Sequence, residues 1–282
     1  MKIFLLCLLL LPFCSRAVEL HLSGPLPAGW DSTRIALDYE SLVTELFPVG
    51  QKETLPLTLI FTTVPLDRTF GLPEWGGGGA LGRDTVVVSL RMRPFLELSP
   101  ERILRHELVH IALHRLLPNA RLPRWFHEGM AMHFSGEMEI EEHVTLSKAI
   151  FTHSLVPLSS IDSVNLFSRF RADLAYCESH LAVAFLIRTY GRRVLPELLS
   201  NIDQQGDFAD AFYDTFGLTE SEMEKMFRED LIKRYHLVFL FADTYLFWTV
   251  GVVLFLIAVI AVKRRNRKTL RKMEADETLE NT

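Results

Sequence analysis

Three residues in one short stretch have the side chains needed to bind a metal ion and activate water. His106 and His110 stand four positions apart, and Glu107 follows the first of them. Residues four apart share one face of a helix, so both imidazoles can grip the same metal ion. The carboxylate of Glu107 lies beside that face and can act as a general base. The spacing predicts metal-assisted hydrolysis, provided that the chain supplies a helix and a further ligand.

The stretch around these residues is typical of a buried, well-defined helix. Ser99 is a good N-cap, Pro100 suits the first helical position, and Glu101 favours the positive end of the helix dipole. Apolar residues recur up to Leu117, and Pro118 stops the helix. Burial of two histidines and a carboxylate in such a helix is costly unless they are paired or bind a metal.

A tetrahedral zinc site with an open position for water needs a third protein ligand. The downstream candidates are His114, His127, Glu128 and His133. His114 lies one turn further along the same straight helix, too far to close on a metal held by the first two histidines. A metzincin would have Gly at 113 and His at 116, but both positions are Leu. The break from Pro118 to Pro123 allows a second helix to return past the site and present Glu128.

Two segments of the chain resemble the motifs of a known protein family. The motif His106-Glu107-Leu108-Val109-His110 is followed by Trp125-Phe126-His127-Glu128-Gly129-Met130-Ala131. Together they resemble the gluzincin clan of zinc peptidases and, more closely, the bacterial peptidase MA-like family. The resemblance continues through Ala175-Tyr176-Cys177-Glu178-Ser179-His180 to Gly191, and more weakly to the helix after Gly217.

The resemblance implies a role for each site residue. His106, His110 and Glu128 bind Zn²⁺, and Glu107 is the catalytic base of a peptidase that acts on protein or peptide substrates. The resemblance also implies that the helix with Tyr176 and His180 lies near the cleft. These two residues are therefore candidate hydrogen-bond donors to the oxyanion that forms during hydrolysis, although a structural role is open for both. His127 and His133 become ordinary residues of the second helix.

At two places this chain differs from particular branches of the clan, and these differences restrict the kind of peptidase that the resemblance implies. Thermolysin-like enzymes orient a zinc histidine with an Asp four residues after the third ligand, and this chain has Met132 there. Aminopeptidases of the clan have an edge motif Gly-Ala-Met-Glu-Asn, whereas residues 79–83 read Gly-Ala-Leu-Gly-Arg and contain no acid. The second difference disfavours an aminopeptidase and favours an endopeptidase or an enzyme of narrow specificity. A non-catalytic binding module that keeps the zincin fold is the alternative function.

The remaining pattern predicts an α+β, zincin-like fold for residues 18–236. Alternating or β-branched runs predict strands over 18–22, 55–63 and 85–90. A capping residue, Asp31 or Ser32, predicts a helix that ends at about Phe47. Residues 18–98 form the strand-rich part. Residues 99–236 form the helical part, with the zinc site and a C-terminal helical subdomain whose last helix is capped by Thr219.

Residues 75–83 read Trp-Gly-Gly-Gly-Gly-Ala-Leu-Gly-Arg. Four consecutive glycines carry a high ordering cost, which favours a flexible loop. Bare backbone also suits a sheet edge on which a peptide substrate adds a strand. Both interpretations stay open, and they are compatible.

The two ends of the chain predict export and a membrane anchor. Residues 1–17 combine Lys2, an apolar run and a small-residue cleavage site, as in a signal peptide. Residues 245–262 are uncharged and long enough to span a bilayer, and the basic tail 263–282 fixes that end in the cytoplasm. We expect a single-pass protein of the bacterial inner membrane with its catalytic domain on the extracytoplasmic side.

Charge and cysteine content restrict the remaining possibilities. The formal net charge is −5, and without the +3 of the tail and the +2 of Lys2 and Arg16 it is −10. Such an acidic surface repels phosphate backbones, so we expect no nucleic-acid partner. Cys7 and Cys14 leave with the signal peptide, and Cys177 is expected to be a buried structural thiol.

Overall fold

The structure is a computed structural model that describes residues 18–27, 29–48, 56–72, 76–91, 99–136, 140–235 and 244–280. The predicted signal peptide, 1–17, lies outside the described residues. The chain divides into two compact units, one of Met1–Met138 with Val156–Phe227 and one of Glu139–Leu155 with Arg228–Thr282. The described part is mostly helical with one small sheet, so the α+β prediction is confirmed at that level.

Four strands form the sheet of the first unit. The strands are β1 (Leu20–Ser23), β2 (Leu57–Thr62), β3 (Gly78–Leu81) and β4 (Thr85–Ser89), and their spatial order is β1-β2-β4-β3. Strands β1, β2 and β4 are parallel, whereas β3 is antiparallel to β4. Val86, Val87 and Val88 are all fully buried, because β4 is covered on both faces. The three predicted strands are confirmed, with β1 shifted towards the C-terminus.

The flexible-loop interpretation of the glycine run is wrong for Gly78–Leu81, which forms strand β3. A Cβ atom on Gly78 would lie 2.6 Å from the backbone oxygen of Val87 and 2.9 Å from Cγ2 of Ile103. Glycine is therefore needed here because the strand passes too close to its neighbours for any side chain. The position of β3 at the end of the sheet agrees with the edge interpretation.

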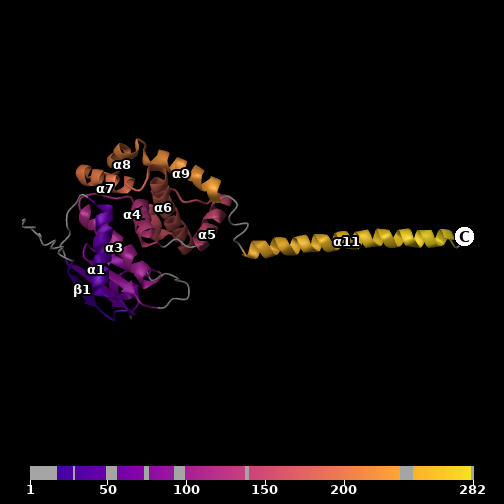
Figure 1. Ribbon diagram of the computed structural model, residues 1–282, viewed down its shortest axis with the longest axis horizontal. Coiled ribbons are helices and arrows are strands. Elements are labelled where there is room, and N and C mark those ends of the chain that lie inside the picture. The colour runs from indigo at the N-terminus through magenta and orange to yellow at the C-terminus, as the bar shows by residue number, and fades with distance from the viewer. Residues whose placement is uncertain are drawn as a thin grey trace, which may run out of the picture. The chain divides into compact units, whose positions relative to one another are not determined.

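The helices of the first unit pack around the sheet and around one another. They are α1 (Ser32–Leu46), α2 (Leu66–Phe70), α3 (Pro100–Leu116), α4 (Arg124–Ser135), the 3₁₀ helix η1 (Leu158–Leu166), α6 (Arg169–Tyr190), α7 (Val194–Gln205), α8 (Phe208–Phe216) and α9 (Glu220–Tyr235), the last of which continues into the second unit. Helix α3 packs on β3 and β4, and α4 lies between α3 and α6 (Figure 1).

The C-terminal subdomain is tied to α4 by aromatic packing. The indole of Trp125 is fully buried, meets the rings of Phe208 and Phe212 edge to face, and donates a hydrogen bond of 2.9 Å from Nε1 to Oε2 of Glu220. Thr219 caps α9 as predicted, since its hydroxyl accepts from the backbone N–H of Glu222 and its own N–H donates to the Glu222 carboxylate. This packing fixes the start of α4, the helix that carries Glu128.

Helices α4 and α6 cross at Gly129. A Cβ atom there would lie 2.3 Å from the backbone oxygen of Ser179 and 2.7 Å from Cγ2 of Val183. The absent side chain therefore sets the distance between the two helices.

We expect Gly129→Val to lower the free energy of unfolding by about 1–3 kcal/mol, because the added carbons force α4 and α6 apart. Urea unfolding of the two proteins measures this loss. The matched control is Gly251→Ala, where an added Cβ meets nothing within 4 Å. Equal stability of Gly129→Val and the wild type would show that the close crossing is not needed.

The second unit contains α5 (Ile140–Phe151), the end of α9, and α11 (Thr244–Glu280). Ser147 on α5 donates a hydrogen bond to the backbone oxygen of Tyr235. Helix α11 exposes a run of large apolar side chains from Trp248 to Val262.

None of the helices in the described part of the chain combines the length and the apolar character that crossing a bilayer requires. The transmembrane helix predicted over 245–262 is therefore not confirmed.

Candidate metal centre

Helix α3 holds the predicted motif, and both of its ends are fixed. Ser99 caps the N-terminus, since its hydroxyl accepts from the backbone N–H of Arg102 at 3.4 Å. Near the C-terminus the buried Arg115 donates to the backbone oxygen of Arg83 and, at 2.7 Å, to that of Pro56. The C-terminal end of the helix that carries the histidines is thus fastened to the segments that precede β2 and β4.

The structure brings His106, His110 and Glu128 together. Their ligand atoms all lie within 4.8 Å of one another. Nε2 of His106 and Nε2 of His110 each lie 3.5 Å from Oε2 of Glu128. Two helices contribute to this cluster, since Glu128 comes from α4. Two imidazole nitrogens and one carboxylate oxygen are a ligand set that suits zinc and leaves a fourth position for water.

Burial and the histidines act on Glu128 in opposite directions. Burial raises the pKa of this carboxyl, but the positive charge of His110 and hydrogen bonds from both histidines hold it well below the usual range. Glu128 is therefore a carboxylate at neutral pH, although its side chain is only 8% exposed. A divalent cation held between this carboxylate and two neutral imidazoles would compensate the buried negative charge.

Glu107 lies buried next to the edge strand. Its Cγ would be 3.4 Å from a Cβ atom on Gly78, so the backbone of β3 passes directly beside it. The glycine run and the histidine motif, which are separate features in the sequence, thus meet at this carboxylate.

Tyr176 on α6 faces the same cluster. Burial and the negative charge of Glu128 raise the pKa of its phenol to about 12, and a hydrogen bond from the Arg124 guanidinium opposes them. The phenol is therefore protonated at neutral pH and can donate a hydrogen bond. The role of oxyanion donor stays a prediction for Tyr176.

His180 lies one turn further along α6 than Tyr176. It is buried, and its ring lies 5.8 Å from that of His133 on α4. The role predicted for His180 is not tested by this position.

Two further histidines stack beside the cluster. The ring of His127 is parallel to that of His110 at 4.4 Å, and the ring of His114 lies 4.9 Å from His127. Burial, followed by the charge of His110, lowers the pKa of His127 well below the usual value, so its ring is neutral. Neither belongs to the three-residue cluster formed by the described residues.

Met132 stands where thermolysin-like enzymes have an Asp that accepts a hydrogen bond from a zinc histidine. In the described part of the chain, the buried Nδ1 of His110 has no hydrogen-bond partner. The ring of His127 stacks on His110 and cannot accept a bond in that orientation.

Arg124 also belongs to the site, although its place there was not predicted from the sequence. It donates a hydrogen bond of 3.1 Å from Nε to Oε1 of Glu128. The signal that could have identified it is the spacing of four residues between a base and an acid at the start of a helix.

The segment that contains the site matches the model of a known protein family. A family model described as the Peptidase MA superfamily matches residues 62–233, which include α3, α4 and α6. The uncharacterized protein YhcO of Bacillus subtilis (strain 168) is 24% identical over 141 residues, which cover 47% of this chain and 42% of YhcO. The chain therefore matches less than half the length of that relative.

Proposed function

Because the chain belongs to the Peptidase MA superfamily, we propose that it is a zinc-dependent peptidase of the gluzincin type. The observation that carries the proposal is the convergence of His106, His110 and Glu128 beside Glu107. In this proposal the first three residues are the zinc ligands and Glu107 is the general base. Zinc, when bound, supplies a Lewis acid that polarises the scissile carbonyl and lowers the pKa of a water molecule.

The chain's own residues then move the proton and support the developing charge. Glu107 takes the proton from the attacking water and passes it to the leaving amine. Tyr176 donates its phenolic hydrogen to the carbonyl oxygen as negative charge develops there. Its pKa of about 12 supports this role, since the phenol keeps its proton at neutral pH.

The substrate is proposed to be a protein or peptide that lies along β3. The backbone N–H of Ser89 bonds to the oxygen of Gly77, which places Gly77, Gly79 and Leu81 in the hydrogen-bonded pairs with β4. Because these pairs alternate, Gly78 and Ala80 direct their backbone groups to the outer edge. An extended peptide can add to that edge as a further strand. The absence of an acid in residues 79–83 favours an endopeptidase over an aminopeptidase.

We expect Ala80→Pro to lower kcat/KM for a peptide substrate by about 10-fold, a loss of one or two hydrogen bonds. Proline removes the outward N–H, and it is tolerated at an edge because that N–H does not bond to β4. Steady-state kinetics measure the effect. Ala80→Ser, which keeps the N–H, is the matched control. Unchanged kinetics in Ala80→Pro would exclude strand addition at this residue.

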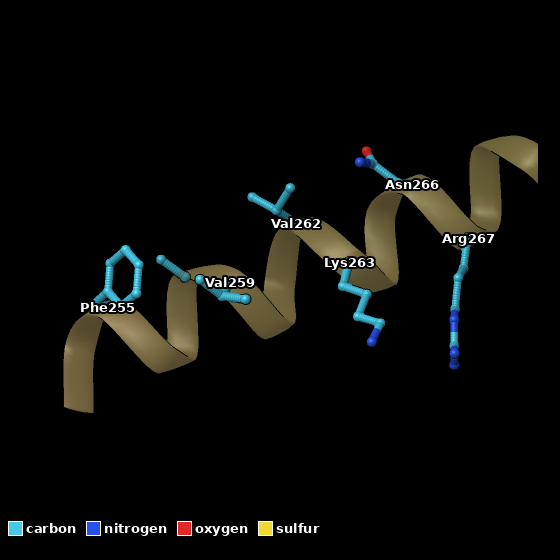
Figure 2. Close-up of a pocket in the computed structure, with 7 residues that line it drawn as sticks. Phe255, Val259, Val262, Lys263, Asn266 and Arg267 are labelled. Carbon is cyan, nitrogen blue, oxygen red and sulfur yellow. The ribbon is translucent and has the colours of Figure 1, made fainter. Parts of the chain in front are cut away.

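The same proposal includes attachment to a membrane through residues 245–262. This part rests on the sequence, where eighteen uncharged residues precede seven basic ones within 263–272. The exposure of the apolar side chains on α11 supports it. Figure 2 shows Phe255, Val259 and Val262 followed along the helix by Lys263, Asn266 and Arg267, where the apolar segment gives way to the basic one. The proposed location is the bacterial inner membrane, with the peptidase on the extracytoplasmic side.

Fractionation of cells tests the attachment. We expect the full chain to stay with membranes washed in alkaline carbonate, and the double substitution Leu254→Asp with Ile257→Asp to release it, because two charges oppose burial in lipid. The control places the same two aspartates in the basic segment, as Asn266→Asp with Thr269→Asp. Release of the unmodified chain by carbonate would rule out an integral membrane anchor.

Metal analysis and proteolysis of the purified protein test the function itself. We expect about one zinc per chain, loss of peptide cleavage on chelation, and recovery on adding zinc. A protein without zinc, or with zinc and no cleavage of any member of a peptide library, would instead support the non-catalytic binding module.

A further inference from the structure

Arg124 is the point where three elements of the first unit meet. Its backbone N–H donates to Oδ1 of Asp162 on η1 at 3.0 Å. Its guanidinium donates to Oε1 of Glu128 on α4 and to the phenol of Tyr176 on α6. The preceding Pro123 offers no side-chain cap, so Asp162 takes that place and fixes the start of α4.

The bond to Glu128 assigns a different partner to each oxygen of this carboxylate. Oε2 faces the two histidines at 3.5 Å, whereas Oε1 accepts from Arg124 at 3.1 Å. A carboxylate held at one oxygen cannot rotate freely, so the other oxygen keeps its direction towards the histidines. Outer partners of this kind orient metal ligands and typically change metal affinity by about 10–100-fold.

The bond to Tyr176 fixes the direction of the phenol. A phenol has one hydrogen to donate and two lone pairs that accept. Since the guanidinium occupies a lone pair, the phenolic hydrogen remains for another acceptor. One planar guanidinium with five N–H donors can serve both Glu128 and Tyr176, which a lysine ammonium on a flexible stem does less well.

We propose that Arg124 is a positioning residue that orients the ligand Glu128 and the donor Tyr176 at the same time. The inference rests on the proposed function, because it assigns Glu128 to zinc and Tyr176 to the substrate oxygen. It goes beyond that proposal in coupling the two sites through one side chain.

Zinc affinity tests the first half of the proposal. We expect Arg124→Gln to weaken zinc binding by about 10–100-fold in competition with a chelator, and to change the visible absorption spectrum of the cobalt-substituted protein. Arg124→Lys should bind zinc with an affinity between those of the wild type and Arg124→Gln. If the Gln variant does not fold, the zinc affinity of Arg124→Lys is compared with that of the wild type instead. Arg121→Gln, an exposed arginine on the loop before α4, is the matched control.

A double-mutant cycle at saturating zinc tests the second half. We expect Tyr176→Phe to lower kcat in the wild type but to have little further effect in Arg124→Gln, because the phenol is already misoriented there. Unchanged zinc affinity in both Arg124 variants, or a full effect of Tyr176→Phe in the Arg124→Gln background, would overturn the proposal. Failure of the peptidase proposal has a separate sign, namely a wild-type protein that binds no zinc or cleaves no peptide.

Discussion

Replacement of Glu107 by Gln is expected to lower kcat by about 10²–10⁴-fold while the zinc content stays the same. Glutamine has nearly the same shape as glutamate, so it fits the space beside Gly78 and leaves His106 and His110 undisturbed. Its amide cannot accept the proton of the attacking water. Turnover of a peptide substrate and metal analysis of the same preparation measure the two quantities together.

The matched control for this substitution is Glu101→Gln. Glu101 is an exposed residue in the first turn of the same helix, so its loss changes the charge of α3 without touching the cluster. We expect this variant to keep wild-type turnover. Full activity in Glu107→Gln would mean that another group takes the proton, and the assignment of the general base would be wrong.

Removal of the proposed third ligand has the second large expected effect. We expect Glu128→Ala to weaken zinc binding by more than about 100-fold, which exceeds the usual effect of losing an outer partner. The change removes the only carboxylate oxygen of the three-residue cluster. It also leaves the guanidinium of Arg124 without the acceptor at 3.1 Å. Zinc affinity measured by chelator competition gives the result directly.

A histidine on the same helix provides the comparison. His133 lies five residues after Glu128 on α4, and its ring lies 5.8 Å from that of His180. We expect His133→Ala to bind zinc as the wild type does. If instead Glu128→Ala retained zinc and His127→Ala lost it, the third ligand would be His127, which stacks on His110.

Local signals in the sequence were sufficient for the helix that carries the motif. Ser99, Pro100 and Pro118 mark its ends, and the structure has the helix from Pro100 to Leu116. The second helix was predicted from the break at Pro118–Pro123, and it carries Glu128 towards the histidines. Both predictions depend on residues close together in the chain, where capping and proline effects are decisive.

Some features were not predicted from the sequence, because they depend on tertiary contacts. Glycine has little intrinsic preference for a strand, so β3 forms because β4 offers hydrogen bonds and α3 leaves no room for side chains. Arg124 was read only as part of a helix start, because its bond to Tyr176 joins α4 to α6 and leaves no mark on local spacing. Helix α5 and the 3₁₀ helix η1 were also not predicted.

The contact between Gly78 and Glu107 makes the proposed general base depend on strand β3, which supplies none of the proposed metal ligands. The proposed metal ligands all lie within residues 106–128, on α3 and α4. The surroundings of Glu107 also require β3, which pairs with β4 and lies against α3. Displacement of β3 would therefore impair the proposed proton transfer by Glu107 while leaving the three proposed metal ligands in place.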